Sequence, residues 1–370
     1  MIERRDVRRA AAAGLLWALL GPLGAGCALA AASSPSGAQR AADAGRALLG
    51  TPAPRLVLTT IDGKHIDLGR AYGHQAVYLK FWATWCVPCR EQMPHLERTF
   101  RNAGADLVVI AIDAGFNDTL QDVLAYRRSV GLTVPIVLDD GRLGQAFNLR
   151  VTPQHIVIGR DGRILYVGHL ADERLEQALR AARTAAPAGA TLARTAAPAG
   201  PTGAMQYRIG DRPDGISVTT LDGGTFPVAV PGKPTVLAFL SPWCESYLAT
   251  SRPRLAADCR AAREQLAQRG TDPGVRWLGV ASGLWASSED LAEYREQYHV
   301  AIPLTLDESG RLFREFQVPT VPALLLIDGN GQLVRRIDGS AAGAPQALAT
   351  LLADAPGKRV PLSKVVPDPR

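Results

Sequence analysis

The chain is poor in the residues that metal sites require. Its 370 residues include only five cysteines and six histidines, and the histidines are scattered singly. Cys86 and Cys89 form a close pair, but no second such pair and no His-X-X-X-His motif follows them. A zinc ion held by this pair would lack its remaining ligands, so a structural zinc site is disfavoured.

The chain also lacks a basic stripe. Its formal net charge is +6, but part of the excess lies near the N-terminus and the other arginines are dispersed among Asp and Glu. No cluster of basic residues interleaves with aromatic ones, so nucleic-acid binding is excluded. A weakly cationic surface would still favour anionic lipid headgroups.

What the chain does have is a Cys-X-X-Cys motif directly after a hydrophobic run. Residues 76–82 predict a buried strand, and residues 88–97 predict a helix with Pro88 in its first turn, where the missing N–H costs nothing. Cys86 then lies at the helix N-terminus, where free N–H groups and the helix dipole lower the thiol pKa below about 8.5. A thiolate can attack a disulfide, and a second cysteine can attack the mixed disulfide that results. Cys86 is thus the predicted nucleophile and Cys89 the resolving thiol.

A static disulfide is the alternative for this pair. A spacing of three residues closes too small a loop to stabilise much, so this alternative is disfavoured. Further along the chain, residues 136–138 and 155–158 predict strands, and Asp161-Gly162 predicts a hairpin turn into residues 163–167. Thr152-Pro153 stands just before the second of these strands, as a cis-proline loop would.

These features together closely resemble the thioredoxin fold, and within it the thiol-disulfide oxidoreductases of the TlpA/ResA type. The resemblance covers about residues 51–180. It rests on four features: Phe81-Trp82-Ala83-Thr84-Trp85-Cys86-Val87-Pro88-Cys89-Arg90, the helix-kinking Met93-Pro94, Thr152-Pro153 and Asp161-Gly162. The resemblance implies that Pro153 is cis and packs opposite the cysteines, that the Thr152 backbone binds an extended substrate, and that Trp85 shapes the surface around the thiol. It also implies that the redox disulfide needs no metal or organic cofactor.

One position departs from the family pattern. Family members often carry Glu three residues after the second cysteine, where it is thought to affect cysteine protonation. Here that position is Gln92, and the carboxylate of Glu91 is turned about 100° away on a helix. His155, two residues past Pro153, either approaches the site or points elsewhere.

The chain repeats itself. Thr59-Thr60-Ile61-Asp62-Gly63 recurs as Thr219-Thr220-Leu221-Asp222-Gly223, and Leu138-Asp139 recurs as Leu306-Asp307. Counting along the chain aligns Trp243-Cys244 with Trp85-Cys86 and Pro322 with Pro153. We therefore predict a second thioredoxin-like domain over residues 207–357, in which Tyr247 replaces the resolving cysteine.

Three roles remain open for Cys244: a vestige in a binding domain, a one-cysteine site that accepts a mixed disulfide, or a partner for another cysteine. The last is disfavoured because Cys259 is fifteen residues away. On a continuous helix that spacing is about 22 Å, beyond the reach of a disulfide. Cys259 is predicted to be a small buried apolar side chain. Glu245 is expected to oppose thiolate formation at Cys244.

The predicted fold class is α/β, with two thioredoxin-like domains, each a central mixed sheet flanked by helices. Residues 181–206, rich in Ala, Pro and Gly, predict a flexible linker between them. Residues 1–32 predict an export signal or membrane anchor, since arginines precede a long uncharged stretch with small-residue cleavage sites. Arg4-Arg5 resembles a twin-arginine signal, and Cys27 makes a lipoprotein the alternative. These features predict a periplasmic protein.

The resemblance implies that the protein reduces disulfides in cysteine-containing proteins, for example in cytochrome c maturation, with electrons from a membrane thiol carrier. The rival functions are disulfide formation by an oxidant and a binding or scaffold role in which the thiols are incidental. The direction of electron flow separates the first two, since reduction potentials run from about −270 mV for thioredoxin to about −120 mV for a strong oxidant.

Overall fold

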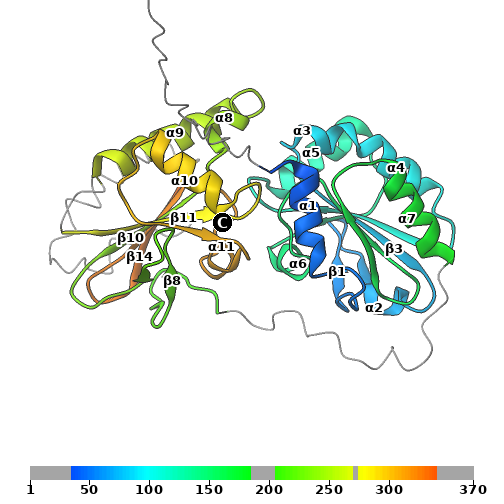
Figure 1. Ribbon diagram of the computed structural model, residues 1–370, viewed down its shortest axis with the longest axis horizontal. Coiled ribbons are helices and arrows are strands. Elements are labelled where there is room, and N and C mark those ends of the chain that lie inside the picture. Colours follow the sequence, from blue (N-terminus) through cyan, green and yellow to red (C-terminus); the bar gives the residue numbers. More distant parts are fainter. Residues whose placement is uncertain (1–34, 185–204, 270–273, 340–370) are drawn as a thin grey trace, which may run out of the picture. The chain divides into compact units, whose positions relative to one another are not determined.

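The computed structural model describes residues 35–184, 205–269 and 274–339 (Figure 1). The predicted export segment and most of the predicted linker lie outside these residues. We call residues 35–184 the N-terminal half and residues 205–339 the C-terminal half. In the part of the chain described, no helix is both long and apolar enough to cross a membrane.

The N-terminal half is built on a mixed five-stranded sheet whose central strand leads into the cysteine motif. The strand order is β5-β4-β3-β6-β7. Strand β4 pairs in parallel with β3 and β5, whereas β6 pairs antiparallel with both β3 and β7. The strands are β3 (Ala76–Trp82), β4 (Leu107–Asp113), β5 (Ile136–Leu138), β6 (Gln154–Ile158) and β7 (Ile164–Gly168). Before them comes a small hairpin of β1 (Val57–Thr59) and β2 (His65–Asp67).

The central strand β3 is buried along its whole length. Because side chains alternate across a strand, Val77, Leu79 and Phe81 join one hydrophobic core and Tyr78 and Trp82 join the other. Burial on both faces explains why this strand appears in the sequence as an almost continuous hydrophobic run.

Helices cover this sheet. Among them α7 packs against β3, β6 and β7, and α4 packs against β4. The predicted helix over residues 88–97 is two helices that meet at Gln92, as the Met93-Pro94 kink requires. The helices are α1 (Gly37–Arg46), α2 (Leu68–Ala71), α3 (Val87–Glu91), α4 (Met93–Arg101), α5 (Leu120–Val130), α6 (Arg142–Ala146) and α7 (Glu173–Thr184).

Two of these helices lie wholly or partly outside residues 51–180, the range that the family resemblance covers. Helix α1 precedes residue 51, yet it packs on β7 with Ala41 and Ala44 buried. Helix α7 continues to Thr184, and Ala182 is buried, so the first four residues of the predicted linker are helical.

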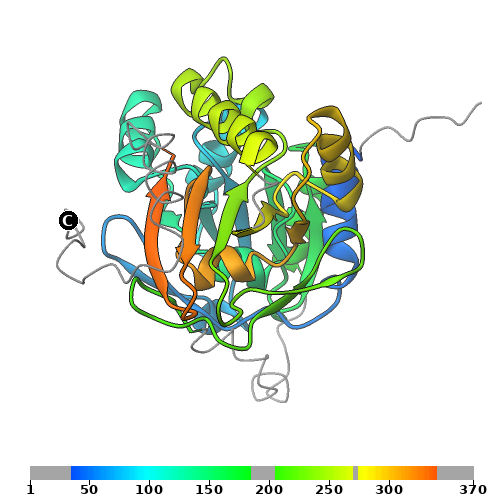
Figure 2. The ribbon, with the colours of Figure 1, turned by 90° about the vertical axis from the view of Figure 1, so that its left-hand side faces the viewer.

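The C-terminal half repeats the architecture. Its sheet has the order β12-β11-β10-β13-β14, and Figure 2 shows β14, β13 and β10 side by side. The strands are β8 (Ser217–Thr219), β9 (Thr225–Pro227), β10 (Thr235–Leu240), β11 (Arg276–Ser282), β12 (Leu304–Asp307), β13 (Ala323–Ile327) and β14 (Leu333–Asp338). The helices are α8 (Cys244–Tyr247), α9 (Pro253–Arg269), α10 (Ser288–Gln297) and α11 (Arg311–Glu315). The prediction of two thioredoxin-like folds is thereby confirmed.

The sequence repeats occupy equivalent places in the two halves. Asp139 accepts hydrogen bonds from the backbone N–H groups of Leu143 and Gly144, at 2.9 and 2.7 Å, where α6 begins. Asp307 does the same for α11, accepting from the N–H groups of Arg311 and Phe313 at 2.9 and 3.0 Å. Burial raises the pKa of Asp139 to about 6, so its capping hydrogen bonds form at some cost in desolvation.

Candidate active site

The cysteine motif lies where the sequence places it, between β3 and α3. Cys86 and Cys89 form a disulfide with their Cα atoms 5.2 Å apart. Cys86 is the N-cap of α3, and the Cys89 backbone N–H donates a hydrogen bond to the Cys86 Sγ at 3.2 Å. Pro88 lies in the first turn of the helix, as predicted. In the reduced protein this N–H would stabilise a Cys86 thiolate.

The predicted cis-proline faces the cysteine pair. The Thr152-Pro153 peptide bond is cis, and the Cys86 Sγ lies 3.4 Å from the Thr152 carbonyl oxygen. A carbonyl beside the sulfur is the acceptor that an extended substrate backbone would need if it bound next to the reacting disulfide.

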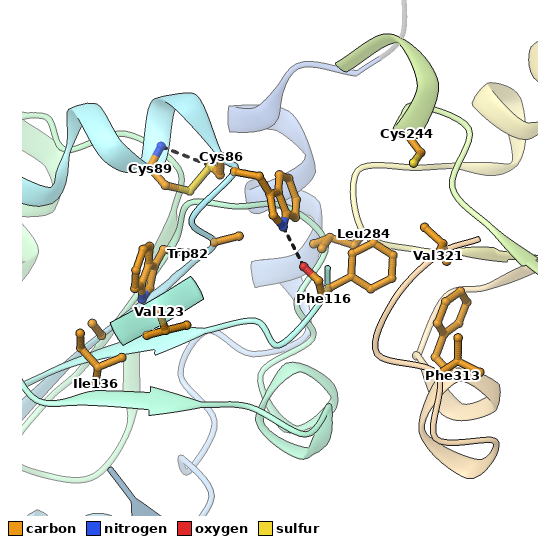
Figure 3. Close-up of a cluster of buried hydrophobic side chains, with 14 of the residues drawn as sticks. Trp82, Cys86, Cys89, Phe116, Val123, Ile136, Cys244, Leu284, Phe313 and Val321 are labelled. Carbon is orange, nitrogen blue, oxygen red and sulfur yellow. Dashed lines mark hydrogen bonds between the residues drawn. A yellow bond between two sulfur atoms is a disulfide. The ribbon is translucent and has the colours of Figure 1, made fainter. Parts of the chain in front are cut away.

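Trp85 is part of a cluster of aromatic side chains next to the motif. Its indole Nε1–H donates to the Phe116 carbonyl oxygen at 2.7 Å. Figure 3 shows Phe116 next to Leu284 of the C-terminal half. Its ring also packs against Trp243 and Tyr247, with ring centroids 5.0 and 6.1 Å away. Trp85 is therefore 2% exposed, and the surface that it was predicted to shape is covered by residues of the C-terminal half.

Residues of the C-terminal half also bind Thr152, which the sequence assigns to substrate docking, and the backbone close to the assigned residues. The Tyr247 hydroxyl accepts a hydrogen bond from the Val87 N–H at 3.2 Å. The Trp285 indole donates to the Thr152 hydroxyl at 3.1 Å, and the Trp285 N–H donates to the Arg150 carbonyl at 2.8 Å. Cys86 and Thr152 are fully buried in this structure, so a substrate can reach them only if these contacts open.

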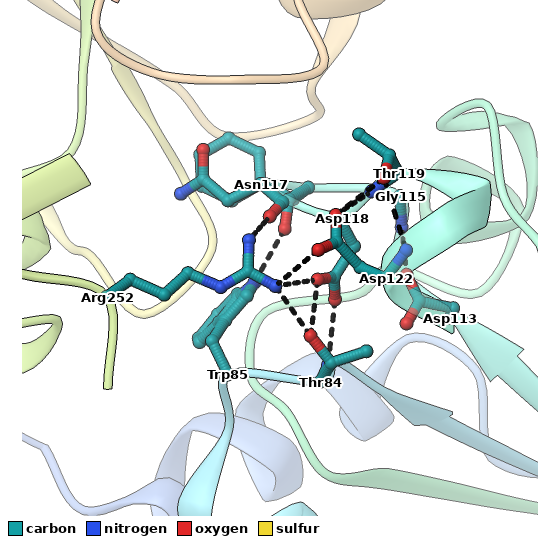
Figure 4. A network of polar contacts seen from close by, with 10 residues as sticks. Thr84, Trp85, Asp113, Gly115, Asn117, Asp118, Thr119, Asp122 and Arg252 are labelled. Atoms are coloured by element: carbon teal, nitrogen blue, oxygen red, sulfur yellow. Dashed lines mark hydrogen bonds and ion pairs between the residues drawn. The ribbon is translucent and has the colours of Figure 1, made fainter. Parts of the chain in front are cut away.

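An ion pair holds the same region together. Asp118 accepts hydrogen bonds from the Thr84 backbone N–H at 2.7 Å and from the Thr84 hydroxyl, and it pairs with Arg252 (Figure 4). Arg252 also donates to the Asn117 carbonyl. Burial raises the pKa of Asp118, while the hydrogen bonds from Thr84 and the charge of Arg252 act in the opposite direction. The Asp118 side chain has no exposed surface, so Arg252 supplies the charge that compensates for its burial.

Lys80 is a site residue that the sequence interpretation missed. It is fully buried, and its Nζ donates to the Cys89 carbonyl oxygen at 3.3 Å. Burial lowers its pKa to about 7, so charged and neutral forms coexist at neutral pH. A lysine in the middle of a strand that is otherwise apolar was the signal that could have identified it.

Replacing Lys80 with methionine is expected to flatten the dependence of stability on pH. The folded-state pKa is about 7 and the ordinary value is 10.5. Between these values the unfolded chain binds more protons than the folded one, so the free energy of unfolding rises with pH. The slope from this one group is at most about 1.4 kcal/mol per pH unit. Denaturant unfolding at pH 7 and pH 9.5 measures it, with Lys64→Met, at an exposed position, as the control. An unchanged slope in Lys80→Met would show that Lys80 does not titrate in this range.

Gln92 belongs to a partly buried chain of polar contacts rather than to a carboxylate site. Its side-chain oxygen can only accept, so His155 carries its proton on Nε2, 2.8 Å away, and His155 Nδ1 accepts from the Tyr78 hydroxyl at 2.8 Å. The Gln92 amide donates to the His169 carbonyl, and the His169 ring bonds the Pro153 carbonyl at 2.7 Å. Burial holds the pKa of His155 well below its ordinary value, so the ring is neutral. His155 thus reaches the site through Gln92, and His169 links Gln92, at the end of α3, to the cis-proline loop.

The prediction for Cys259 is wrong. Cys244 and Cys259 form a disulfide with their Cα atoms 6.2 Å apart. The predicted separation assumed a continuous helix, but α8 ends at Tyr247 and α9 begins at Pro253, so the chain turns between them. Cys259 is also partly exposed rather than a buried apolar side chain.

Three further features of the C-terminal half concern the predicted site. The Val321-Pro322 bond is cis, like its counterpart Thr152-Pro153. Glu245 is paired with Arg260 and Arg263, at 2.8 and 2.9 Å, and these pairs lower its pKa. Its charge is therefore compensated, and the expected opposition to a Cys244 thiolate is reduced. Among the described residues, no group of His, Cys, Asp and Glu side chains is arranged to hold a metal ion.

Comparison with known proteins agrees with this geometry. The Redoxin family model matches residues 48–182. The thioredoxin-like protein YneN of Bacillus subtilis is 32% identical over 133 residues, which cover 35% of this chain and 78% of YneN. The thiol-disulfide oxidoreductase ResA of Bacillus thuringiensis is 30% identical over 145 residues, covering 38% of this chain and 81% of that protein. This chain belongs to the ResA family of thiol-disulfide oxidoreductases. ResA of Halalkalibacterium halodurans is 32% identical over 142 residues, covering 37% of this chain and 78% of that protein.

The family membership identifies the chemistry of the first disulfide. The protein is a thiol-disulfide oxidoreductase, and its Cys-X-X-Cys pair is Cys86 and Cys89. The ResA relatives are matched over little more than a third of this chain, and the Redoxin model lies wholly within the N-terminal half.

Proposed function

We propose that this protein reduces disulfides in cysteine-containing proteins outside the cytoplasm. The observation that carries the proposal is the Cys86–Cys89 disulfide on a strand-to-helix turn, opposite cis-Pro153, in a member of the ResA family. The N-terminal sequence supports export to the periplasm, by a twin-arginine or general secretory signal or as a lipoprotein through Cys27. Reduction of apocytochrome c is one role that fits, with electrons supplied by a membrane thiol carrier.

The reaction proceeds by two disulfide exchanges. The Cys86 thiolate attacks one sulfur of the substrate disulfide, which forms a mixed disulfide and releases the other substrate sulfur as a thiolate. Cys89 then loses its proton and attacks the Cys86 sulfur, which releases the second substrate thiolate and leaves the Cys86–Cys89 disulfide. The substrate gains two electrons and two protons, and the cysteine pair loses them.

Two groups near the pair would assist these steps. The Cys89 N–H, 3.2 Å from the Cys86 Sγ, stabilises negative charge on that sulfur. Lys80 lies against the Cys89 backbone, and with a pKa of about 7 its neutral form is available to accept the Cys89 proton. Thr152 and Pro153 would bind the backbone of the substrate next to the attacked disulfide.

The reduction potential of the Cys86–Cys89 pair tests the direction of electron flow. We expect a value near that of thioredoxin, about −270 mV, from equilibration in glutathione or dithiothreitol buffers. A value near that of a strong oxidant, about −120 mV, would instead assign disulfide formation to this protein. Alkylation followed by mass spectrometry keeps the signal of this pair separate from that of Cys244 and Cys259.

A further inference from the structure

We propose that Cys244–Cys259 is a second redox-active disulfide, which opens by attack of a thiolate at Cys259. The position of Cys244 supports this. The Cys244 N–H donates to the Ser241 carbonyl at 3.1 Å, as the Cys86 N–H donates to the Ala83 carbonyl at 3.2 Å. Cys244 therefore occupies the place in the C-terminal half that Cys86 occupies in the N-terminal half.

The neighbouring tryptophans show the same correspondence. The Trp243 indole donates to the Leu284 carbonyl at 2.8 Å, and the Trp85 indole donates to the Phe116 carbonyl at 2.7 Å. The turn that presents the first cysteine is thus preserved in the C-terminal half. The two disulfides differ in their second sulfur. Tyr247 occupies the position that corresponds to Cys89, and the second sulfur of the C-terminal half comes from Cys259 on α9.

The Cys259 sulfur, like the Cys86 sulfur, lies beside the backbone that precedes a cis-proline. Its Sγ is 4.0 Å from the carbonyl oxygen of Val321, the residue before cis-Pro322. The Cys86 Sγ is 3.4 Å from the carbonyl oxygen of Thr152, the residue before cis-Pro153. In both halves a sulfur of the disulfide therefore faces the backbone that precedes the cis-proline.

Exposure favours attack at Cys259 over attack at Cys244. Cys259 is partly exposed, whereas Cys244 has no exposed surface. Cys259 also borders a cavity of about 20 Å³, together with Ser241 and Pro322. An incoming thiolate meets Cys259 first, so Cys244 is the leaving sulfur.

The charges around the disulfide are compatible with a thiolate intermediate. Arg260 and Arg263 lie on α9 close to Cys259, and both pair with Glu245, whose charge they compensate. Asp258 precedes Cys259, and burial raises its pKa. The negative charge of Glu245 beside Cys244 is therefore compensated by its two arginine partners.

The proposed reaction is exchange with a dithiol. One thiolate of the dithiol bonds to the Cys259 sulfur, and the S–S bond breaks to leave Cys244 as a thiolate, which takes up a proton. The second thiol of the dithiol then loses its proton and attacks the mixed disulfide, which frees Cys259 and leaves the dithiol oxidised. The protein gains two electrons and two protons.

Redox titration of the full chain carrying Cys86→Ser and Cys89→Ser tests the proposal. The variant is equilibrated in graded glutathione buffers, alkylated, and analysed by mass spectrometry at each cysteine. We expect Cys244 and Cys259 to become thiols together, with an equilibrium constant within a thousandfold of that for Cys86–Cys89 in the wild type. A constant further away than this, or reduction only after circular dichroism has reported unfolding, would overturn the proposal and make the disulfide structural.

Single replacements on the same background identify the attacked sulfur. Cys244→Ser leaves Cys259 as a partly exposed thiol, and Cys259→Ser leaves Cys244 buried. We expect the Cys244→Ser protein to form a mixed disulfide with oxidised glutathione at least tenfold faster, with native tryptophan fluorescence in both proteins as the check on folding. Equal rates in the two proteins, or a faster reaction at Cys244, would contradict attack at Cys259. Neither experiment depends on the direction of electron flow at Cys86.

Discussion

Replacing Cys86 with serine is expected to abolish disulfide reduction, with turnover falling at least a thousandfold. The serine hydroxyl stays protonated at neutral pH, so the variant lacks the thiolate that must attack the substrate. Cys89 cannot take over, because of the two sulfurs only that of Cys86 lies against the Thr152 carbonyl. Steady-state reduction of a protein disulfide by dithiothreitol, with the variant as catalyst, measures the effect.

Replacing Cys89 with serine is the matched comparison. This variant keeps the nucleophile but cannot resolve the mixed disulfide, so it should accumulate as a covalent adduct with the substrate that a reductant reverses. Non-reducing electrophoresis shows the adduct. If Cys86→Ser forms the adduct and Cys89→Ser does not, the assigned roles are reversed. If Cys86→Ser retains full activity, the thiols are incidental to the function.

Replacing Arg252 with alanine is expected to expose the redox disulfide. Arg252 pairs with Asp118, whose side chain has no exposed surface, and it also bonds the Asn117 carbonyl. Removing one partner of a buried ion pair costs about 3 kcal/mol or more, because the other charge stays buried. This loss weakens the contacts by which Trp243 and Tyr247 cover Trp85 and Val87. We expect the disulfide to be reduced by dithiothreitol at least tenfold faster than in the wild type.

The experiment follows thiol release at Cys86 and Cys89 by alkylation at short times. Arg254→Ala is the control, because Arg254 is an exposed arginine at the start of the same helix, α9. Thermal unfolding of both variants shows whether the chain stays folded. An unchanged rate of reduction in a folded Arg252→Ala protein would show that this ion pair does not limit access to Cys86.

Buried residues explain why the sequence predicted the N-terminal fold so well. The run from Ala76 to Trp82 is buried on both faces of the sheet, so its pattern is almost continuous and hard to mistake. The turn that follows has a proline in the first helical turn, and Thr152-Pro153 precedes a second buried strand. These are local signals, set by a few neighbouring residues, and each of them is found in the structure.

Contacts between distant residues explain the failures. The distance between Cys244 and Cys259 depends on whether the helix continues, and the break between Tyr247 and Pro253 decided it. The position of Lys80 in an apolar strand is visible in the sequence, but its contact with the Cys89 carbonyl depends on how β3 packs against α3. The pairing of Arg252 with Asp118 joins residues 134 positions apart.

The amino-acid order alone thus determined the redox motif and the repeat of the fold, because hydrophobic periodicity and turn residues act over short distances. The family resemblance of the same residues implied the cis-proline loop. Only the tertiary structure decided which cysteine pairs with Cys244, which buried charge lies under the active disulfide, and which residues cover Cys86. Those outcomes depend on how separate segments pack, and packing is determined by the whole set of buried contacts rather than by any one segment.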